Sequence, residues 1–175
     1  MPRKTRIHGH ATRHVPIRRN YCFACGPDNP EGMHLKFHYD QRKRRFVCRF
    51  RLGRKYTGPP AHAHGGVIAT LLDEAMGKVN KLREVIAMTR SMEVEYLKPV
   101  PLRRPLRVES WELRVRGRRH INTAEILSAR GQVLARSRAT FLAIDPLKMF
   151  ARHLPKGWAQ KAEAKNAGVK SPGVK

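Results

Sequence analysis

His64-Gly65-Gly66-Val-Ile-Ala-Thr-Leu-Leu-Asp73-Glu74-Ala-Met-Gly77 is the stretch that decides the fold of this chain. Its apolar residues recur at the i, i+1, i+4, i+5 spacing of a helix packed against a sheet, which predicts a helix over residues 65–82. Asp73 falls on a neighbouring face of that helix. An unpaired buried carboxylate is costly, so chemistry is the leading reason for it. The apolar stripe comprises Val67, Ile68, Leu71, Leu72, Ala75, Met76, Val79 and Leu82.

The segments around the helix have the pattern of strands. Two short alternating segments, 35–39 and 46–52, precede it, with a polar hairpin connection at 41–45. Four longer segments follow, at about 85–98, 105–117, 120–130 and 133–145. Pro99 and Pro101 break the first of these from the second, and Gly117 and Gly131 stand where tight turns belong. Short connections predict an antiparallel meander after the helix, so the fold class is α+β, with one long central helix wrapped by a curved antiparallel β-sheet.

Composition limits the domain organisation and the location. A chain of 175 residues suits one domain, which we predict at 21–146 between a flexible basic N-terminal arm at 1–20 and a basic, largely disordered C-terminal tail at 147–175. No apolar run is long enough to span a bilayer. Three cysteines do not make a disulfide framework, which favours a reducing compartment and predicts a cytoplasmic protein. The acid-free, arginine-bearing N-terminus also resembles a mitochondrial transit peptide, which is the alternative.

The charge of this chain is strongly positive. It has 37 Lys and Arg against 13 Asp and Glu, a net charge of +24. Such a surface indicates a partner that carries phosphates, nucleic acid among them, through the basic tails. The competing interpretation is that the cations serve only solubility. Both interpretations stay open at the level of sequence.

The start of the predicted helix is suited to carbonyl chemistry. Its unsatisfied backbone N–H groups and positive dipole end can bind a developing oxyanion, and Gly65 and Gly66 let a substrate approach closely. Asp73 can act as a general base or as a nucleophile. Eight residues of helix separate Gly65 from Asp73 by about 12 Å, at about 1.5 Å per residue. Both residues of one chain therefore cannot touch one carbonyl group, which predicts a homo-oligomer, a dimer or a tetramer, with a shared site.

The motifs together resemble a known family. H-G-G-x₆-D-E-x-x-G is preceded by Cys22-x-x-Cys25-Gly26…Asn29-Pro30-x-Gly32-x-x-Leu35 and followed by Thr89-x-x-Met92-x-Val94-x-Tyr96-Leu97-x-Pro99. Over about 21–145 this combination resembles the hotdog-fold acyl-CoA thioesterases of the phenylacetate-pathway (PaaI) type. The resemblance implies a helix wrapped by a sheet, active sites at a subunit interface and acyl-CoA as the substrate class.

The resemblance also implies roles for particular residues. Asp73 matches the catalytic carboxylate, Gly65 the oxyanion-hole amide with Gly66 beside it, and Thr89 the hydroxyl residue that orients the attacking water. One position departs from the family. Many members carry Asn or Gln seven residues before the first glycine of the HGG motif, where this chain has Gly58.

Other candidates have weaker support from sequence. His64 either hydrogen-bonds the loop or takes part in the chemistry. Arginine suits bidentate phosphate contacts, so four arginines are candidates for the CoA phosphates. Cys22-x₂-Cys25-x₈-His34-x₃-His38 has nearly the spacing of a Cys₂His₂ zinc site, but a turn with free thiols is the preferred interpretation, with no metal and no cofactor. The four arginines are Arg90, Arg116, Arg118 and Arg119.

The sequence therefore predicts an enzyme that hydrolyses acyl-CoA thioesters. The alternative is a non-catalytic hotdog module that senses acyl-CoA or docks on RNA or a ribonucleoprotein through its basic surface. A hotdog dehydratase ranks last, because that class usually needs a histidine in a different arrangement near the helix start.

Overall fold

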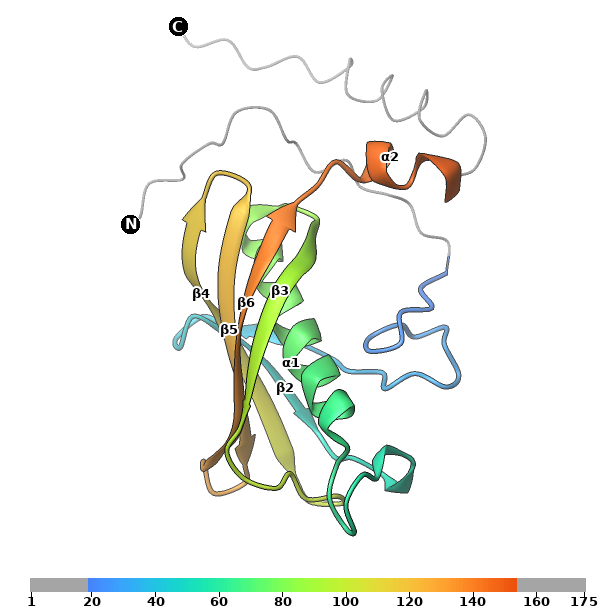
Figure 1. Cartoon of the computed structure of the whole chain (residues 1–175), viewed down its shortest axis with the longest axis vertical. Coiled ribbons are helices and arrows are strands. Elements are labelled where there is room, and N and C mark those ends of the chain that lie inside the picture. The colour runs from blue at the N-terminus through green and yellow to red at the C-terminus, as the bar shows by residue number, and fades with distance from the viewer. Residues whose placement is uncertain (1–18, 154–175) are drawn as a thin grey trace, which may run out of the picture.

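The computed structural model describes residues 19–153, which form one long helix packed against one face of a six-stranded antiparallel sheet (Figure 1). The predicted α+β architecture is confirmed. The helix is α1 (Gly65–Val79), and the strands are β1 (His38–Asp40), β2 (Arg45–Phe50), β3 (Ala87–Tyr96), β4 (Leu106–Arg116), β5 (Arg119–Ser128) and β6 (Val133–Ala143). A short helix α2 (Pro146–Met149) and the 3₁₀ turns Arg54–Tyr56, Asn80–Arg83 and Ala151–His153 complete the elements.

The order of the strands differs from the predicted meander. The sheet runs β1-β2-β4-β5-β6-β3, so β3 pairs with β6 and does not neighbour β4. The connection between β3 and β4 contains Pro99, Pro101 and Pro105, which cannot donate backbone hydrogen bonds and do not make a tight hairpin. The chain therefore crosses the end of the sheet. As a result β3 forms one edge of the sheet.

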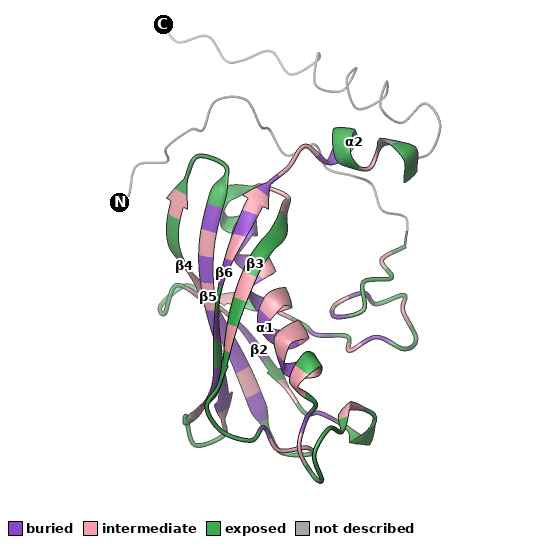
Figure 2. Cartoon of the chain, viewed as in Figure 1, coloured by how far each residue is buried: buried purple, intermediate pink, exposed green. Residues whose placement is uncertain are grey.

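The predicted apolar stripe of the helix lies in the core (Figure 2). Six of its eight residues are buried, and Val67 is half-buried. Leu82 is the exception and is exposed, because α1 ends at Val79 and not at residue 82. A 3₁₀ turn follows, and Glu84, at φ 54°, takes the left-handed conformation that stops further helix.

Polar side chains of the sheet fasten the second half of α1. The Ser110 hydroxyl donates to the Ala75 carbonyl at 2.6 Å. The Asn122 amide donates to the Met76 carbonyl at 3.0 Å and to Asn80 Oδ1 at 2.9 Å. Both donors are fully buried, and a buried amide or hydroxyl must be paired, so these contacts fix the position of α1 on the sheet.

Parts of the predicted domain organisation fall outside the described residues. The N-terminal arm, apart from residues 19 and 20, and the C-terminal tail beyond residue 153 are among them, so both stay predictions. Within residues 19–153 no helix is long and apolar enough to cross a membrane.

Candidate active site

The Asp73 carboxylate contacts the hydroxyl group of Thr89. Thr89 Oγ1, near the start of β3, donates to Asp73 Oδ1 at 2.7 Å, so the edge strand and α1 bring together two residues predicted from sequence. Burial raises the pKa of Asp73 above its ordinary value; the Thr89 hydrogen bond lowers this pKa, and the nearby charge of Glu74 raises it. A carboxylate with a raised pKa is a better proton acceptor near neutral pH.

No ion pair to Asp73 is found among residues 19–153. The described ion pairs join lysine or arginine to Glu74, Glu95, Glu109 and Glu112. In a chain with 37 lysines and arginines, a half-buried carboxylate paired only with a hydroxyl is unusual. The Asp73 carboxylate is therefore not held by an ion pair within the described residues.

A β-bulge separates the roles of Thr89 and Ser91. Two residues apart on a regular strand, they would share a face. The register shifts between them, however: Thr89 pairs with Phe141, and Ser91 pairs with Thr140. Directly opposed residues share a face of the sheet, so Thr89 lies on the inner face with buried Phe141 while Ser91 lies on the outer face. The bulge thus directs one hydroxyl, that of Thr89, toward α1.

The start of α1 leaves one backbone donor available. His64 is the N-cap, and its Nδ1 accepts a hydrogen bond from the Gly66 N–H at 2.9 Å. No hydrogen bond from the Gly65 N–H is found within the described residues. Within the described residues the cap therefore uses the Gly66 donor and leaves that of Gly65 free, and the cap occupies only Nδ1 of His64, so its predicted part in the chemistry stays a prediction.

Two features near Gly65 were not predicted from sequence. The Tyr96 hydroxyl, at the end of β3, donates to the Gly65 carbonyl at 3.2 Å and covers this glycine. A Cβ on Gly58 would lie 2.7 Å from the Cα of His64. The loop therefore packs too tightly on the helix start for the amide side chain that the family resemblance implies here. A sequence pattern cannot reveal such a contact between a loop and the residue six positions after it.

The structure does not bring the two halves of the predicted site together within one chain. Gly65 lies beside Tyr96 at the last residue of β3, and Asp73 lies beside Thr89 near its first. Gly65 and Asp73 are eight residues apart on α1, about 12 Å at about 1.5 Å per residue. The helix-start donor and the carboxylate therefore stay well separated in the single chain.

The four candidate arginines are exposed. Arg90 is the extra residue of the β3 bulge. Arg116, Arg118 and Arg119 lie at the β4–β5 hairpin around Gly117, and Arg118 Nε donates to the Ala143 carbonyl at 3.0 Å. A separate pocket of about 440 Å³ is lined by residues of β2, β4, β5 and their connections, and none of the predicted site residues lines it.

The candidate zinc pattern is not assembled as the sequence spacing suggests. His34 Nε2 lies 2.5 Å from the Asn29 carbonyl, and His38 is exposed on β1. Among the described residues, Cys22 and Cys25 gather instead with Glu74 of α1. Both cysteines are free thiols, as is buried Cys48.

Known proteins match both the sequence and the fold. Residues 61–135 match the family model of the thioesterase superfamily. The acyl-coenzyme A thioesterase THEM4 of Rattus norvegicus is 32% identical over 118 residues, which cover 67% of this chain and 51% of that protein. The Xenopus laevis protein of the same name is 30% identical over 116 residues, 66% of this chain and 52% of its own. The chain thus spans about half the length of the curated relatives it matches.

Solved structures agree on the fold. One described as a thioesterase superfamily protein has a TM-score of 0.66 and 29% identity, covering 70% of this chain and 60% of its own. The E. coli PaaI protein of the phenylacetic acid degradation operon has a TM-score of 0.55 and 16% identity, covering 58% and 73%. A Bacillus halodurans protein solved with CoA has a TM-score of 0.56 and 24% identity, covering 63% and 74%. With its hotdog fold and the match over residues 61–135, this chain belongs to the thioesterase superfamily.

Proposed function

We propose that this chain hydrolyses acyl-CoA thioesters to a free acid and CoA, at a site shared by two subunits. The observation that carries the proposal is the Asp73 carboxylate, which is half-buried, bonded by the Thr89 hydroxyl and without an ion pair among the described residues. The relatives named acyl-coenzyme A thioesterase and the similar structure solved with CoA support the substrate class.

In the proposed reaction Asp73 is the general base. Thr89 donates to Oδ1, which leaves Oδ2 to accept a proton from a water molecule. The water oxygen attacks the thioester carbonyl carbon, and the oxyanion accepts a hydrogen bond from the backbone N–H of Gly65 of the partner subunit. Collapse of the tetrahedral intermediate breaks the C–S bond, and the proton held by Asp73 passes to the departing CoA thiolate. One water is consumed, and the carboxylate is regenerated.

The edge position of β3 supports the shared site. A ten-residue edge strand is a template for pairing with a second copy of the chain. A twofold axis through the middle of β3 sets its beginning against the end of the partner's β3. Because Asp73 lies beside Thr89 at the beginning, and Gly65 beside Tyr96 at the end, such a dimer brings the carboxylate of one subunit toward the helix start of the other.

The arginines of the β4–β5 hairpin are our candidates for the CoA phosphates. Arg119 pairs with Leu142 of β6, and Leu142 pairs with Met88 of β3. The hairpin therefore lies at the Thr89 end of the sheet, two strand spacings or about 10 Å from the edge. Exposed guanidinium groups at this distance suit a phosphate-bearing tail that leaves the reacting carbonyl.

Nucleic acid and location stay predictions. The nucleic-acid hypothesis depends on the basic surface together with two basic tails that lie mostly outside the described residues. A cytoplasmic location is the expectation from the cysteines. The mitochondrial alternative gains one observation: a relative in Saccharomyces cerevisiae, 26% identical over 121 residues, is named an uncharacterised mitochondrial membrane protein.

The first experiment measures thiol release from short, long and aryl acyl-CoAs by the full-length protein. We expect hydrolysis of at least one class, with its loss in Asp73→Asn. Absence of hydrolysis across all classes, or full turnover by Asp73→Asn, would contradict the proposal.

A subunit-mixing experiment tests whether the site is shared. Gly65→Pro replaces the proposed oxyanion donor by a ring carbon, and the helix tolerates it because proline fits the first position of a helix and His64 before it is already extended, at φ −64° and ψ 140°. If each dimer has two shared sites, co-refolded Asp73→Asn and Gly65→Pro chains regain about a quarter of wild-type activity, since half the dimers are mixed and each has one intact site. A site within one chain regains nothing.

A further inference from the structure

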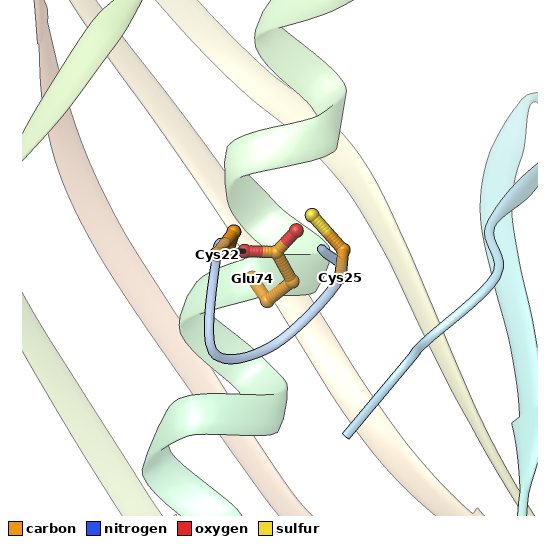
Figure 3. A group of neighbouring side chains, drawn as sticks. All are labelled: Cys22, Cys25 and Glu74. Atoms are coloured by element: carbon orange, nitrogen blue, oxygen red, sulfur yellow. Dashed lines mark hydrogen bonds between the residues drawn. The ribbon is translucent and has the colours of Figure 1, made fainter. Parts of the chain in front are cut away.

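A second polar cluster lies on another face of α1, where the Cys22–Cys25 loop crosses the helix (Figure 3). The Sγ atoms of Cys22 and Cys25 and a carboxylate oxygen of Glu74 all lie within 4.8 Å of one another. Cys22 Sγ is 3.9 Å from Glu74 Oε2. Two soft sulfur donors and one carboxylate oxygen thus converge from elements that are about fifty residues apart in the chain.

The loop is built to hold both thiols in place. The Gly26 N–H donates to the Cys22 carbonyl at 2.8 Å, and the Cys22 N–H donates to Asn20 Oδ1 at 3.0 Å. A Cβ on Gly26 would lie 2.3 Å from the Asn20 carbonyl oxygen, so only glycine fits. The loop geometry is therefore fixed before any ligand arrives, which reduces the entropy cost of binding.

The two oxygen atoms of the Glu74 carboxylate have different partners, because Lys78 pairs with one of them. Its ammonium lies 2.5 Å from Glu74 Oε1 and 3.0 Å from Cys25 Sγ. Oε2 remains directed toward Cys22. Lys78 thus orients the carboxylate as an outer partner does at a metal site. Two thiolates and one carboxylate carry three negative charges, which a divalent ion and the Lys78 ammonium together neutralise.

We propose that Cys22, Cys25 and Glu74 bind a thiophilic divalent cation of the zinc class, with Lys78 as a positioning residue. Thiolate ligands select zinc over magnesium or calcium, whose preferred ligands are oxygen atoms. Three protein ligands leave a fourth tetrahedral position, which the exposure of Cys22 opens to water. A disulfide would explain why the two cysteines lie close together, but it would not explain why Glu74 lies beside them. The inference is independent of the thioesterase proposal.

Cobalt(II) titration of the full chain tests the site directly. The protein is kept reduced with a phosphine and carries no affinity tag. We expect one equivalent of Co²⁺ to give a thiolate charge-transfer band and the visible bands of tetrahedral cobalt, both removed by added Zn²⁺. Histidines elsewhere in the chain do not produce the charge-transfer band, so the signal reports the cysteines.

Variants of the cluster test which residues are ligands, and a variant of the third cysteine controls for the loss of any one thiol. Cys22→Ser and Cys25→Ser should each weaken Zn²⁺ binding at least about a hundredfold, measured by competition with a chromogenic chelator, because loss of an outer partner alone costs 10–100-fold. Glu74→Gln should weaken it strongly as well, and Lys78→Met about tenfold. Cys48→Ala is the matched control, since Cys48 is buried outside the cluster, and it should retain the charge-transfer band and the affinity.

Three results would overturn the proposal. One is the absence of a charge-transfer band in the reduced protein. This holds also if the same protein forms a Cys22–Cys25 disulfide when exposed to air. Another is binding that survives Cys22→Ser or Cys25→Ser. The third is unchanged affinity in Glu74→Gln, which would remove the carboxylate from the ligand set. Circular dichroism of each variant that binds no metal checks that the fold is retained, so that the loss of binding reports the loss of a ligand.

Discussion

Asp73 and Glu74 are adjacent carboxylates on one helix, yet they face different surroundings. Residues that follow one another on a helix point about 100° apart. Asp73 turns toward the edge strand and receives one hydroxyl hydrogen bond, from Thr89. Glu74 turns toward the cysteine loop and pairs with the Lys78 ammonium. Within residues 19–153 Glu74 is stabilised in place by a cation, while Asp73 has no such partner there and is left able to accept a proton. This contrast distinguishes the proposed general base from the proposed metal ligand more clearly than burial does, since both side chains are half-buried.

The largest expected effect comes from removing each carboxylate in turn. General-base catalysis contributes about 10²–10⁴-fold, so Asp73→Asn should lower kcat by that range. Glu74→Gln should change kcat by less than about tenfold. Steady-state kinetics on the best acyl-CoA measures both. Equal losses of kcat in the two variants would show that the two carboxylates do not differ in their importance for catalysis.

The helix start provides the next largest effect. Removing one oxyanion donor costs about 10²–10³ in kcat, so Gly65→Pro should lose that much. Gly65→Ala retains the N–H, and its added Cβ lies at an ordinary contact distance of 3.6 Å from the Tyr96 ring, so it should remain far more active. If proline and alanine had the same effect, the backbone donor would have no role.

The pH dependence sharpens the comparison of Asp73 with its two neighbours. Catalysis needs the ionised form, so kcat/KM should fall as pH drops through the pKa of Asp73, which burial raises above its ordinary value. The Thr89 hydrogen bond lowers this pKa and the Glu74 charge raises it. The acid limb should therefore move to higher pH in Thr89→Val and to lower pH in Glu74→Gln. Shifts in the same direction would mean that Asp73 is not the group that titrates.

The two faces should rank in the opposite order for stability. We expect the variant that disturbs Glu74 to be destabilised, and the Asp73 variant not to be. Lys78→Met leaves Glu74 without its cation and should lower the free energy of unfolding by about 1–3 kcal/mol, the cost of an unsatisfied buried polar group. Asp73→Asn removes a carboxylate that burial disfavours, so its free energy of unfolding should be equal or higher. Urea denaturation of both variants at neutral pH decides this. A destabilised Asp73→Asn would indicate a structural role for the carboxylate.

The loop before the helix gives a comparably small effect. Gly58→Asn introduces the amide that the family resemblance implies at this position, but its Cβ would meet the His64 backbone at 2.7 Å. Overpacking costs about 1–3 kcal/mol, so we expect a lower melting temperature and no gain in kcat. A Gly58→Asn variant with the wild-type melting temperature and kcat would show that the loop moves to accommodate the added side chain.

Much of the fold was predictable from residue periodicity and breakers. The apolar stripe of residues 67–79 defined the buried face of α1, and alternating segments between glycines and prolines predicted the four long strands within a few residues. The position of β3 beside β6 was not predictable, because strand pairing depends on contacts distant in sequence. Leu82 was misassigned for a local reason, since α1 ends at Val79 and the 3₁₀ turn Asn80–Arg83 that follows does not keep the α-helical spacing of the apolar stripe.

The sequence by itself determined the residue types, the eight-residue spacing of Gly65 and Asp73 and the family resemblance, because helical geometry and motif spacing are local properties of the chain. Only the tertiary structure decided the partners of each side chain. It joined Thr89 to Asp73 through a bulge, gave the Gly66 donor to His64, and brought Glu74, not His34 or His38, to the cysteines. Such contacts depend on how separate elements pack, and the packing is fixed by the whole core and not by any one motif.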